Sequence, residues 1–150
     1  MRTFARLAEL AVLQGQEIGT SDWVVVDQAC IDQFARSTGD AQWIHVDPAR
    51  AADGPFGTTV AHGFLTLSLL PRLASGAFRI DDVRMGLNYG LDRVRFPSPV
   101  PVGSRLRGAC VLRRFEAIAG GAQLTMTVTI EREGGAKPAC VAEWVTRHLV

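Results

Sequence analysis

Several features are missing or scarce in this sequence, and each absence excludes a class of protein. No window of about 18 residues is both apolar and free of charge, so no transmembrane helix is expected. The first residues, from Met1 to Leu10, carry a charge every few positions and lack the apolar core of a signal peptide. The formal net charge is only +1, so no strong field favours nucleic acid or an anionic membrane. We therefore expect neither nucleic acid nor a membrane as partner.

Cysteine is also scarce, and its placement excludes the usual cysteine chemistry. The three cysteines, Cys30, Cys110 and Cys140, share no metal-ligand spacing, and their odd number argues against a full disulfide framework. Glycine motifs that bind phosphates or dinucleotides are missing, and no G-x-S-x-G elbow marks a serine hydrolase. We expect reduced thiols in a cytoplasmic protein that works without a metal or a redox cofactor.

The first half of the chain predicts short helices around one strand. Apolar residues at helical spacing predict a helix over 3–14, and a strand with a bend is predicted over 16–26. Asp27 suits the N-cap of a second helix, and Gly39 suits the position just past its end. A long loop over 40–60 follows, with a helical turn over 49–52 that Asp47 and Pro48 begin. Loops of this length inside a compact domain are usually functional.

The second half predicts one buried helix and then a sheet. Residues 61–74 are almost wholly apolar, which is typical of a helix buried on nearly all sides, with Pro71 bending or shortening its end. After a linker over 75–82, apolar and polar residues alternate in four segments, 83–96, 104–116, 122–132 and 139–150. We expect three antiparallel strand pairs, formed by consecutive segments. The apolar content of 47% is typical of a globular protein, and we expect one domain over 1–150. The predicted architecture is α+β, with a curved antiparallel sheet wrapped around the long helix.

The loop contains an acid and a histidine that can work as a pair. Asp40 follows Gly39, and His45 lies five positions later, so a loop that folds back brings their side chains to one point. A carboxylate and a neutral imidazole beside one water can activate that water and move its proton. The alternative is that Asp40 caps a turn and His45 is a hydrogen-bonded loop residue.

His62 and Gly63 stand at the start of the buried helix. The first N–H groups of a helix have no partner within it and favour developing negative charge. Gly63 has no side chain to keep a ligand carbonyl from its N–H, so its position suits an oxyanion site. The alternatives are close packing for Gly63, and a capping or core role for His62. A metal bound by Asp40 and the histidines is not expected, because the spacing of His45 and His62 matches no compact ligand motif.

These segments resemble the MaoC-like, R-specific enoyl-CoA hydratase family, in its NodN-like branch. The resemblance rests on Ser37-Thr38-Gly39-Asp40-x4-His45 with Pro48 and Ala51-Ala52, on Thr59-Val60-Ala61-His62-Gly63-Phe64, on the strand from Asn88 to Val100, and on Lys137 to Glu143. It covers essentially the whole chain. It implies the hotdog fold, in which an antiparallel sheet wraps a long central helix, and a homodimer.

The resemblance also implies the reaction and the site. Asp40 and His45 would activate water for addition to a trans-2-enoyl-CoA, and the Gly63 N–H would hold the thioester oxygen. The product would be the (R)-3-hydroxyacyl-CoA. The family has Asn-Pro between the acid and the histidine, whereas this chain has Gln42-Trp43-Ile44, so Gln42 is expected to take the orienting role. His62 is a further candidate contact to substrate.

Two residues of the predicted strand, Asn88 and Tyr89, are candidates for lining the acyl pocket, although both also suit an ordinary strand. Other activities occur on the same fold, namely acyl-CoA thioesterase and non-catalytic acyl-CoA binding. An intact Asp40 and His45 argue against a non-catalytic protein. Open strand edges predict pairing of two protomers, because an uncovered edge is a template for association.

Overall fold

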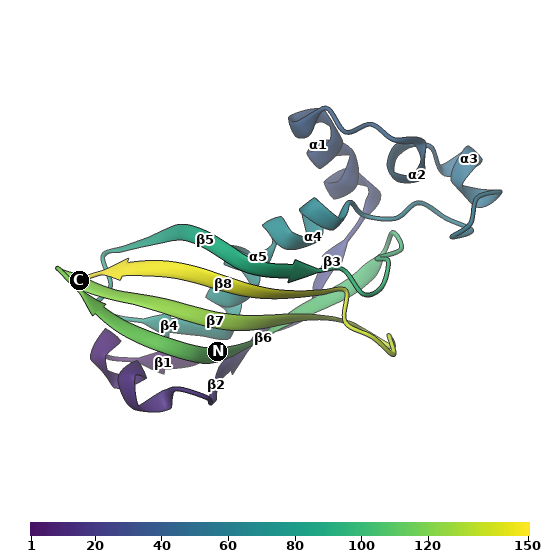
Figure 1. Cartoon of the computed structure of the whole chain (residues 1–150). Helices are drawn as coiled ribbons and strands as arrows, with labels where there is room; N and C mark the ends of the chain where they lie inside the picture. Colours follow the sequence, from purple (N-terminus) through teal and green to yellow (C-terminus); the bar gives the residue numbers. More distant parts are fainter.

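The long strands of the second half of the chain build the main sheet. In the computed structural model, which describes residues 1–150, this sheet has six strands in the order β2-β6-β7-β8-β5, with β3 also paired to β6. The strands are β2 (Glu17–Thr20), β3 (Val24–Val26), β5 (Met85–Arg95), β6 (Ser104–Ile118), β7 (Gly121–Arg132) and β8 (Cys140–Leu149). All their pairings are antiparallel, and the sheet curves around the helices behind it (Figure 1).

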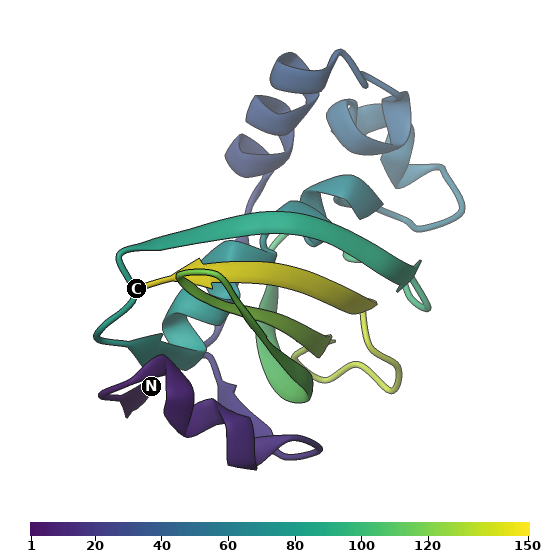
Figure 2. The same ribbon diagram turned by 60° about the vertical axis from the view of Figure 1, so that its left-hand side comes forward.

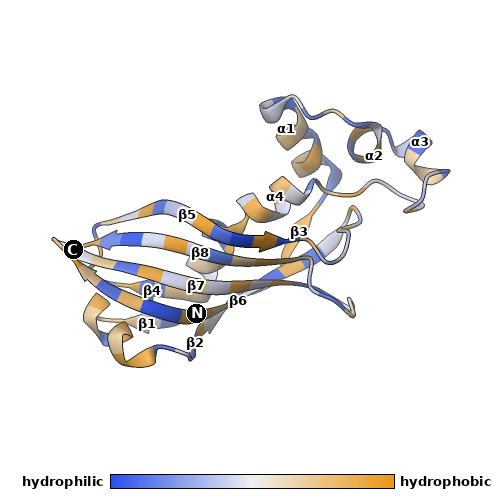
Figure 3. Cartoon of the chain, viewed as in Figure 1, coloured by the Kyte–Doolittle hydropathy of each residue, from blue (hydrophilic) through white to orange (hydrophobic).

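Alternation along the strands decides which face is buried. On β7, Leu124, Met126, Val128 and Ile130 are fully buried on the inner face of the sheet. The residues between them point the other way, so hydropathy changes from residue to residue along the strands (Figure 3). The four long strands predicted from this alternation are confirmed, and so is the curved antiparallel sheet.

The predicted pairing of the first long strand was wrong. We expected 83–96 to pair with 104–116, but β5 pairs with β8, from Met85 opposite Leu149 to Arg95 opposite Val141. Both edges of β6 are already occupied, one by β7 and the other by β2 and β3. The β5 strand therefore crosses to the free edge of β8 and ends the sheet.

The buried helix is present but broken. Two helices, α4 (Gly63–Ser68) and α5 (Leu70–Ala77), meet at Leu69, where a single helix was predicted over 61–74. Pro71 has no N–H to donate to the Leu67 carbonyl, and it lies in the first turn of α5 instead of bending a helix end. Burial also differs between the two helices, because α5 buries Leu70 and Leu73 whereas Phe64 on α4 is exposed. No helix in the structure is long and apolar enough to cross a bilayer.

The N-terminal segment differs from the predicted helix over 3–14. It begins as β1 (Arg2–Phe4), which pairs in parallel with β4 (Phe78–Ile80), and continues as the 3₁₀ helix η1 (Leu7–Leu13). The β4 strand lies in the predicted linker 75–82. Strand pairing buries Phe4, and the Leu7 N–H donates to Asp82 Oδ1 at 2.8 Å, so long-range contacts override the local helical spacing.

Three helices lead to the candidate site. The first, α1 (Gln28–Thr38), begins as predicted at Asp27, whose side chain accepts from the Cys30 N–H, and ends at Gly39 with φ 79°. The predicted turn is α3 (Pro48–Ala52), and between them lies α2 (Trp43–Val46), which was not predicted. Figure 2 shows α1, α2 and α3 as a lobe set apart from the sheet, with α4 leading from this lobe toward it.

Candidate active site

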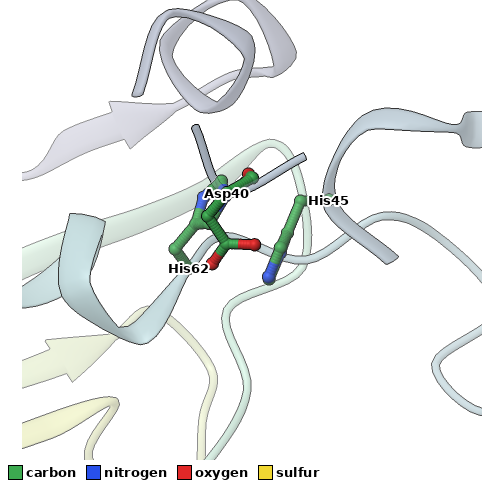
Figure 4. Close-up of side chains that lie close together, drawn as sticks. All are labelled: Asp40, His45 and His62. Atoms are coloured by element: carbon green, nitrogen blue, oxygen red, sulfur yellow. The ribbon is translucent and has the colours of Figure 1, made fainter. Parts of the chain in front are cut away.

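Three side chains of the lobe meet at one point. Asp40 follows α1, His45 lies on α2 and His62 precedes α4, and one side-chain polar atom of each lies within 4.8 Å of the others (Figure 4). His45 and His62 are buried, with exposed fractions of 7% and 2%, whereas Asp40 is exposed. The cluster therefore presents a carboxylate to solvent and supports it from behind with two imidazoles.

The hydrogen bond of His45 decides which of its nitrogens is basic. Its Nδ1 lies 2.6 Å from the Val60 carbonyl oxygen, which can only accept, so Nδ1 carries the proton. The Nε2 atom then holds a lone pair. Val60 also holds the backbone next to this histidine, because its N–H donates to the Ile44 carbonyl at 3.0 Å. The hydrogen bond to Val60 thus leaves Nε2 as the nitrogen of His45 that is available to a substrate or a water.

His62 holds the backbone of Asp40. Its Nε2 lies 2.9 Å from the Asp40 carbonyl oxygen and donates to it. Its ring stacks on that of His45, with centroids 3.7 Å apart and planes 25° apart, and contacts the Phe34 ring at 5.0 Å. With so little of its surface exposed, His62 positions the other two side chains, and the geometry gives it no surface for substrate.

The main chain around Asp40 orients its carboxylate. Gly39, in the left-handed region, turns the chain out of α1 directly before Asp40. The Gln42 N–H then donates to Asp40 Oδ1 at 3.4 Å, and the Asp40 N–H donates to Thr38 Oγ1 at 3.4 Å. The Gln42 side chain makes no capping hydrogen bond at the start of α2. In this structure it is the backbone of Gln42, and not its amide side chain, that contacts the carboxylate.

Gly63 is the first residue of α4, so its N–H has no acceptor within the helix. A Cβ at this position would lie 3.2 Å from the Phe96 ring, which is closer than ordinary packing allows. The close-packing alternative for this glycine therefore holds, and its N–H makes no backbone hydrogen bond at the same time. A hollow of about 290 Å³ opens here between Gly63, Thr66 and Phe96.

Asn88 and Tyr89 lie elsewhere. Both are on β5, and Asn88 lines a cavity of about 350 Å³ between α5 and the β5–β8 end of the sheet. Tyr89 is exposed, and the guanidinium carbon of Arg147 lies 3.6 Å from its ring centroid. Within one chain neither residue is brought to the Asp40, His45 and His62 cluster.

A layer of residues behind the cluster was missed by sequence reasoning. Gln28 donates from Nε2 to the His45 carbonyl oxygen at 2.8 Å, and its Oε1 accepts from Thr59 Oγ1 at 2.6 Å. Thr59 is almost fully buried. The only local signal is a polar residue directly after the N-cap Asp27, which is common in helices that have no such role.

The cluster suits proton transfer better than metal binding. A metal needs lone pairs that converge on one point, but stacked imidazoles direct their in-plane lone pairs side by side. The cysteines are poor nucleophiles, because burial raises the pKa of Cys110 to about 12 and that of Cys140 to about 11, and partial burial also raises the pKa of Cys30. The remaining reactive groups are the Asp40 carboxylate and the Nε2 of His45.

Comparison with known proteins gives consistent matches along the chain. The family model described as MaoC like domain matches residues 10–134. The chain is 54% identical over 150 residues to 3-hydroxyacyl-thioester dehydratase Z of Mycobacterium tuberculosis, covering 99% of both chains. It is 53% identical over 144 residues to nodulation protein N of Rhizobium leguminosarum bv. viciae, covering 93% of this chain and 89% of that one.

Solved structures show the same fold. The R-hydratase PhaJ1 from Pseudomonas aeruginosa matches with a TM-score of 0.77 and 21% identity, covering 97% of this chain and 86% of that one. The (R)-hydratase from A. caviae matches with a TM-score of 0.67 and 24% identity, covering 89% and 94%. At these identities the likeness establishes the fold alone, and it confirms the hotdog architecture expected from the sequence.

Proposed function

This chain belongs to the MaoC-like domain family, and we propose that it catalyses the reversible hydration of a trans-2-enoyl-CoA to the (R)-3-hydroxyacyl-CoA. Membership in this family of dehydratases makes it a hydro-lyase. The observation that carries the proposal is the closeness of the exposed Asp40 carboxylate to the imidazole of His45, whose Nδ1 is already engaged by Val60. That arrangement can hold and activate one water molecule.

The proposed reaction needs only a proton to be taken and returned. The pair removes a proton from water as the water oxygen bonds to C3 of the substrate, and the electrons of the double bond move toward the thioester oxygen. The pair then returns a proton to C2 as the enolate collapses. No electron is gained or lost overall, so the proposal includes no redox cofactor. Holding both groups before substrate arrives lowers the entropic part of the barrier.

The Gly63 N–H is the proposed donor to the thioester oxygen. Negative charge develops on that oxygen when water adds, and a preorganised N–H stabilises it most in the transition state. Support comes from the position of this N–H at the start of α4, where it has no acceptor within the helix, and from the absence of a side chain on Gly63. Gln42 contributes by its backbone contact to Asp40, in place of the amide role expected from the sequence.

We also propose a C2 homodimer through the edge of β5. This strand ends the sheet order and is exposed along nearly its whole length, including the apolar side chains of Met85, Leu87 and Leu91. An exposed apolar edge strand is a template for pairing with a second strand. Pairing of two β5 edges would continue the sheet and cover these side chains. Light scattering should give about twice the 16.2 kDa chain mass, and a monomer at micromolar concentration would contradict it.

A cytoplasmic location is part of the proposal. It is supported by three cysteines that are all free, two of them buried. A reducing compartment keeps such thiols unpaired.

The proposal is tested by following crotonyl-CoA and longer trans-2-enoyl-CoAs in the presence of the protein. We expect loss of the enone absorbance and no free thiol. Release of free thiol from acyl-CoA would indicate the thioesterase alternative, and binding without any product would indicate the non-catalytic one. No loss of absorbance at any chain length would contradict the proposal.

A further inference from the structure

A series of hollows runs along the helices from the candidate active site to the opposite end of the sheet. The first lies at Gly63 and Phe96, the second between Leu67 on α4 and Leu91 on β5, and the third is the cavity of about 350 Å³ beside α5. Pro71, Asn88 and Trp144 line both the second and the third. Figure 2 shows α4 and α5 running along β5 in this direction. The first hollow shares no lining residue with the second, but Gly63 and Leu67 are one helical turn apart on the same face of α4. We therefore take the three hollows as one acyl route from Gly63 to Ala74, roughly 16 Å at the rise of an α-helix.

The far end of this route is not wholly apolar. Two neighbouring inner-face residues of β8, Thr146 and His148, line the cavity, and Thr146 Oγ1 lies 2.9 Å from His148 Nε2. Thr146 is buried, with 4% of its surface exposed. Asn88 lies opposite Thr146 on β5 and adds an amide to the same wall. An alkyl chain gains nothing from polar groups, and burying them is costly unless they are hydrogen-bonded.

One nitrogen of this pair is left for a ligand. Nε2 of His148 is engaged by Thr146, so Nδ1 is the free hydrogen-bonding atom of the ring. On the adjacent strand Gly86 lies beside that edge, where a Cβ would sit 3.8 Å from Nδ1 and from Cε1. The glycine therefore leaves the edge uncovered toward the cavity that it also lines.

The chemistry of the pair favours a hydroxyl over a charged group. Burial lowers the pKa of His148, so the ring is neutral at neutral pH. Because the Thr146 hydroxyl can donate to Nε2 or accept from it, Nδ1 can be a donor or an acceptor. A ligand hydroxyl, which also both donates and accepts, fits either arrangement.

We propose that the Thr146–His148 pair makes the end of the acyl route selective for chains that carry a hydroxyl group at or near the distal end. This inference rests on the proposed function, since it assigns the far cavity to the acyl part of the same substrate. His148 Nδ1 receives the chain hydroxyl, with Asn88 beside it, and the thioester lies at Gly63. The preferred substrate is the one whose acyl chain is long enough for its hydroxyl to reach His148 Nδ1 while its thioester lies at Gly63.

The test measures binding and not turnover, so that it does not depend on hydration. Saturated acyl-CoAs of increasing length are titrated calorimetrically into the intact protein, each paired with the acyl-CoA of the same length that carries a terminal hydroxyl. We expect the hydroxylated member to bind about tenfold more tightly at one length and no more tightly at shorter lengths, as one good hydrogen bond predicts. Equal affinity within every pair would overturn the inference even if hydration is observed.

Variants separate the hydrogen bond from the shape of the cavity. His148→Leu should lose the preference for the hydroxyl, whereas His148→Gln, which keeps an amide donor and acceptor, should retain part of it. Gly86→Ala should reduce the preference by covering the ring edge, because the added Cβ meets the ring at an ordinary contact distance. Thr129→Val, on the outer face of β7, is the matched control and should change nothing. A preference that survives His148→Leu would also overturn the inference.

Discussion

The two ends of the acyl route are built in different ways. At the site end, Asp40, His45 and His62 come from one stretch of the chain, and the two imidazoles are held to its backbone by hydrogen bonds of 2.6 and 2.9 Å. At the far end, Pro71, Gly86 and Thr146 come from distant segments that only the sheet brings together. The residues of the proposed chemistry are therefore close in sequence, whereas those of the proposed selectivity are brought together only by tertiary structure. Each prediction below acts on one end and leaves the other as its reference.

Removing either member of the catalytic pair should have the largest effect. We expect Asp40→Asn and His45→Gln each to lower kcat/KM for crotonyl-CoA by about 10² to 10⁴, because each removes one half of the proton transfer. The double variant should be hardly worse than either single variant, since the two groups act as a unit. Asp40 is exposed, so Asp40→Asn should leave the melting temperature nearly unchanged. Activity near that of the wild type in either variant would show that Asp40 and His45 do not carry out the proton transfer.

His62→Phe should have a smaller effect, limited to turnover. Phenylalanine keeps a ring against His45 but cannot donate to the Asp40 carbonyl oxygen. We expect kcat to fall by about tenfold, the value of one lost hydrogen bond, with KM little changed. The buried Nδ1 of His62 has no partner, so its removal offsets part of the stability lost. A rise in KM with kcat unchanged would indicate that His62 contacts substrate.

Gln28→Met should destabilise the site end by about 1 kcal/mol. It leaves the His45 carbonyl and the Thr59 hydroxyl without their partner in a buried region. Thr59→Val should cost a similar amount, and the double variant should cost less than the sum, because the residues share a hydrogen bond. Urea unfolding of the two singles and the double measures this coupling. Strict additivity would show that the Gln28–Thr59 contact contributes nothing.

The far end should show the smallest effect, a dependence of stability on pH. Burial holds the pKa of His148 below its ordinary value of 6.5, so the unfolded chain binds a proton more readily than the folded one. Stability contributed by the neutral ring is therefore present above about pH 6.5 and is lost as the pH falls. His148→Gln should make the melting temperature less sensitive to pH over this range. An unchanged slope would show that His148 titrates equally in both states.

Local patterns predicted the parts of the fold that local chemistry decides. Asp27 and Gly39 fixed the ends of α1, and alternation located the four long strands, because capping and side-chain direction are properties of short segments. The pairing of β5 with β8 could not be predicted in this way. It depends on which strand edges remain free after β6 is fully paired.

In the candidate site, too, local patterns predicted some residues, whereas the roles of others depend on tertiary structure. Asp40 and His45 could be named from their spacing, because five positions of loop are enough to bring two side chains together. The role of His62 could not, since it requires the fold to bring its ring against His45. The hydrogen-bonding roles of Gln28, Thr59 and His148 could not be predicted from the sequence either. Each acts through a partner on another segment, and that partner is known only when the chain has folded.

The configuration of the product is the sharpest test of the proposed roles of Asp40, His45 and Gly63. Crotonyl-CoA is incubated with the wild-type protein, and the 3-hydroxybutyryl-CoA formed is resolved by chiral chromatography. If Asp40 and His45 deliver water from one side to a thioester held at Gly63, the product is a single enantiomer, and the proposed function requires it to be R. The S enantiomer, or a racemic mixture formed at the rate of the protein-free reaction, would contradict the account.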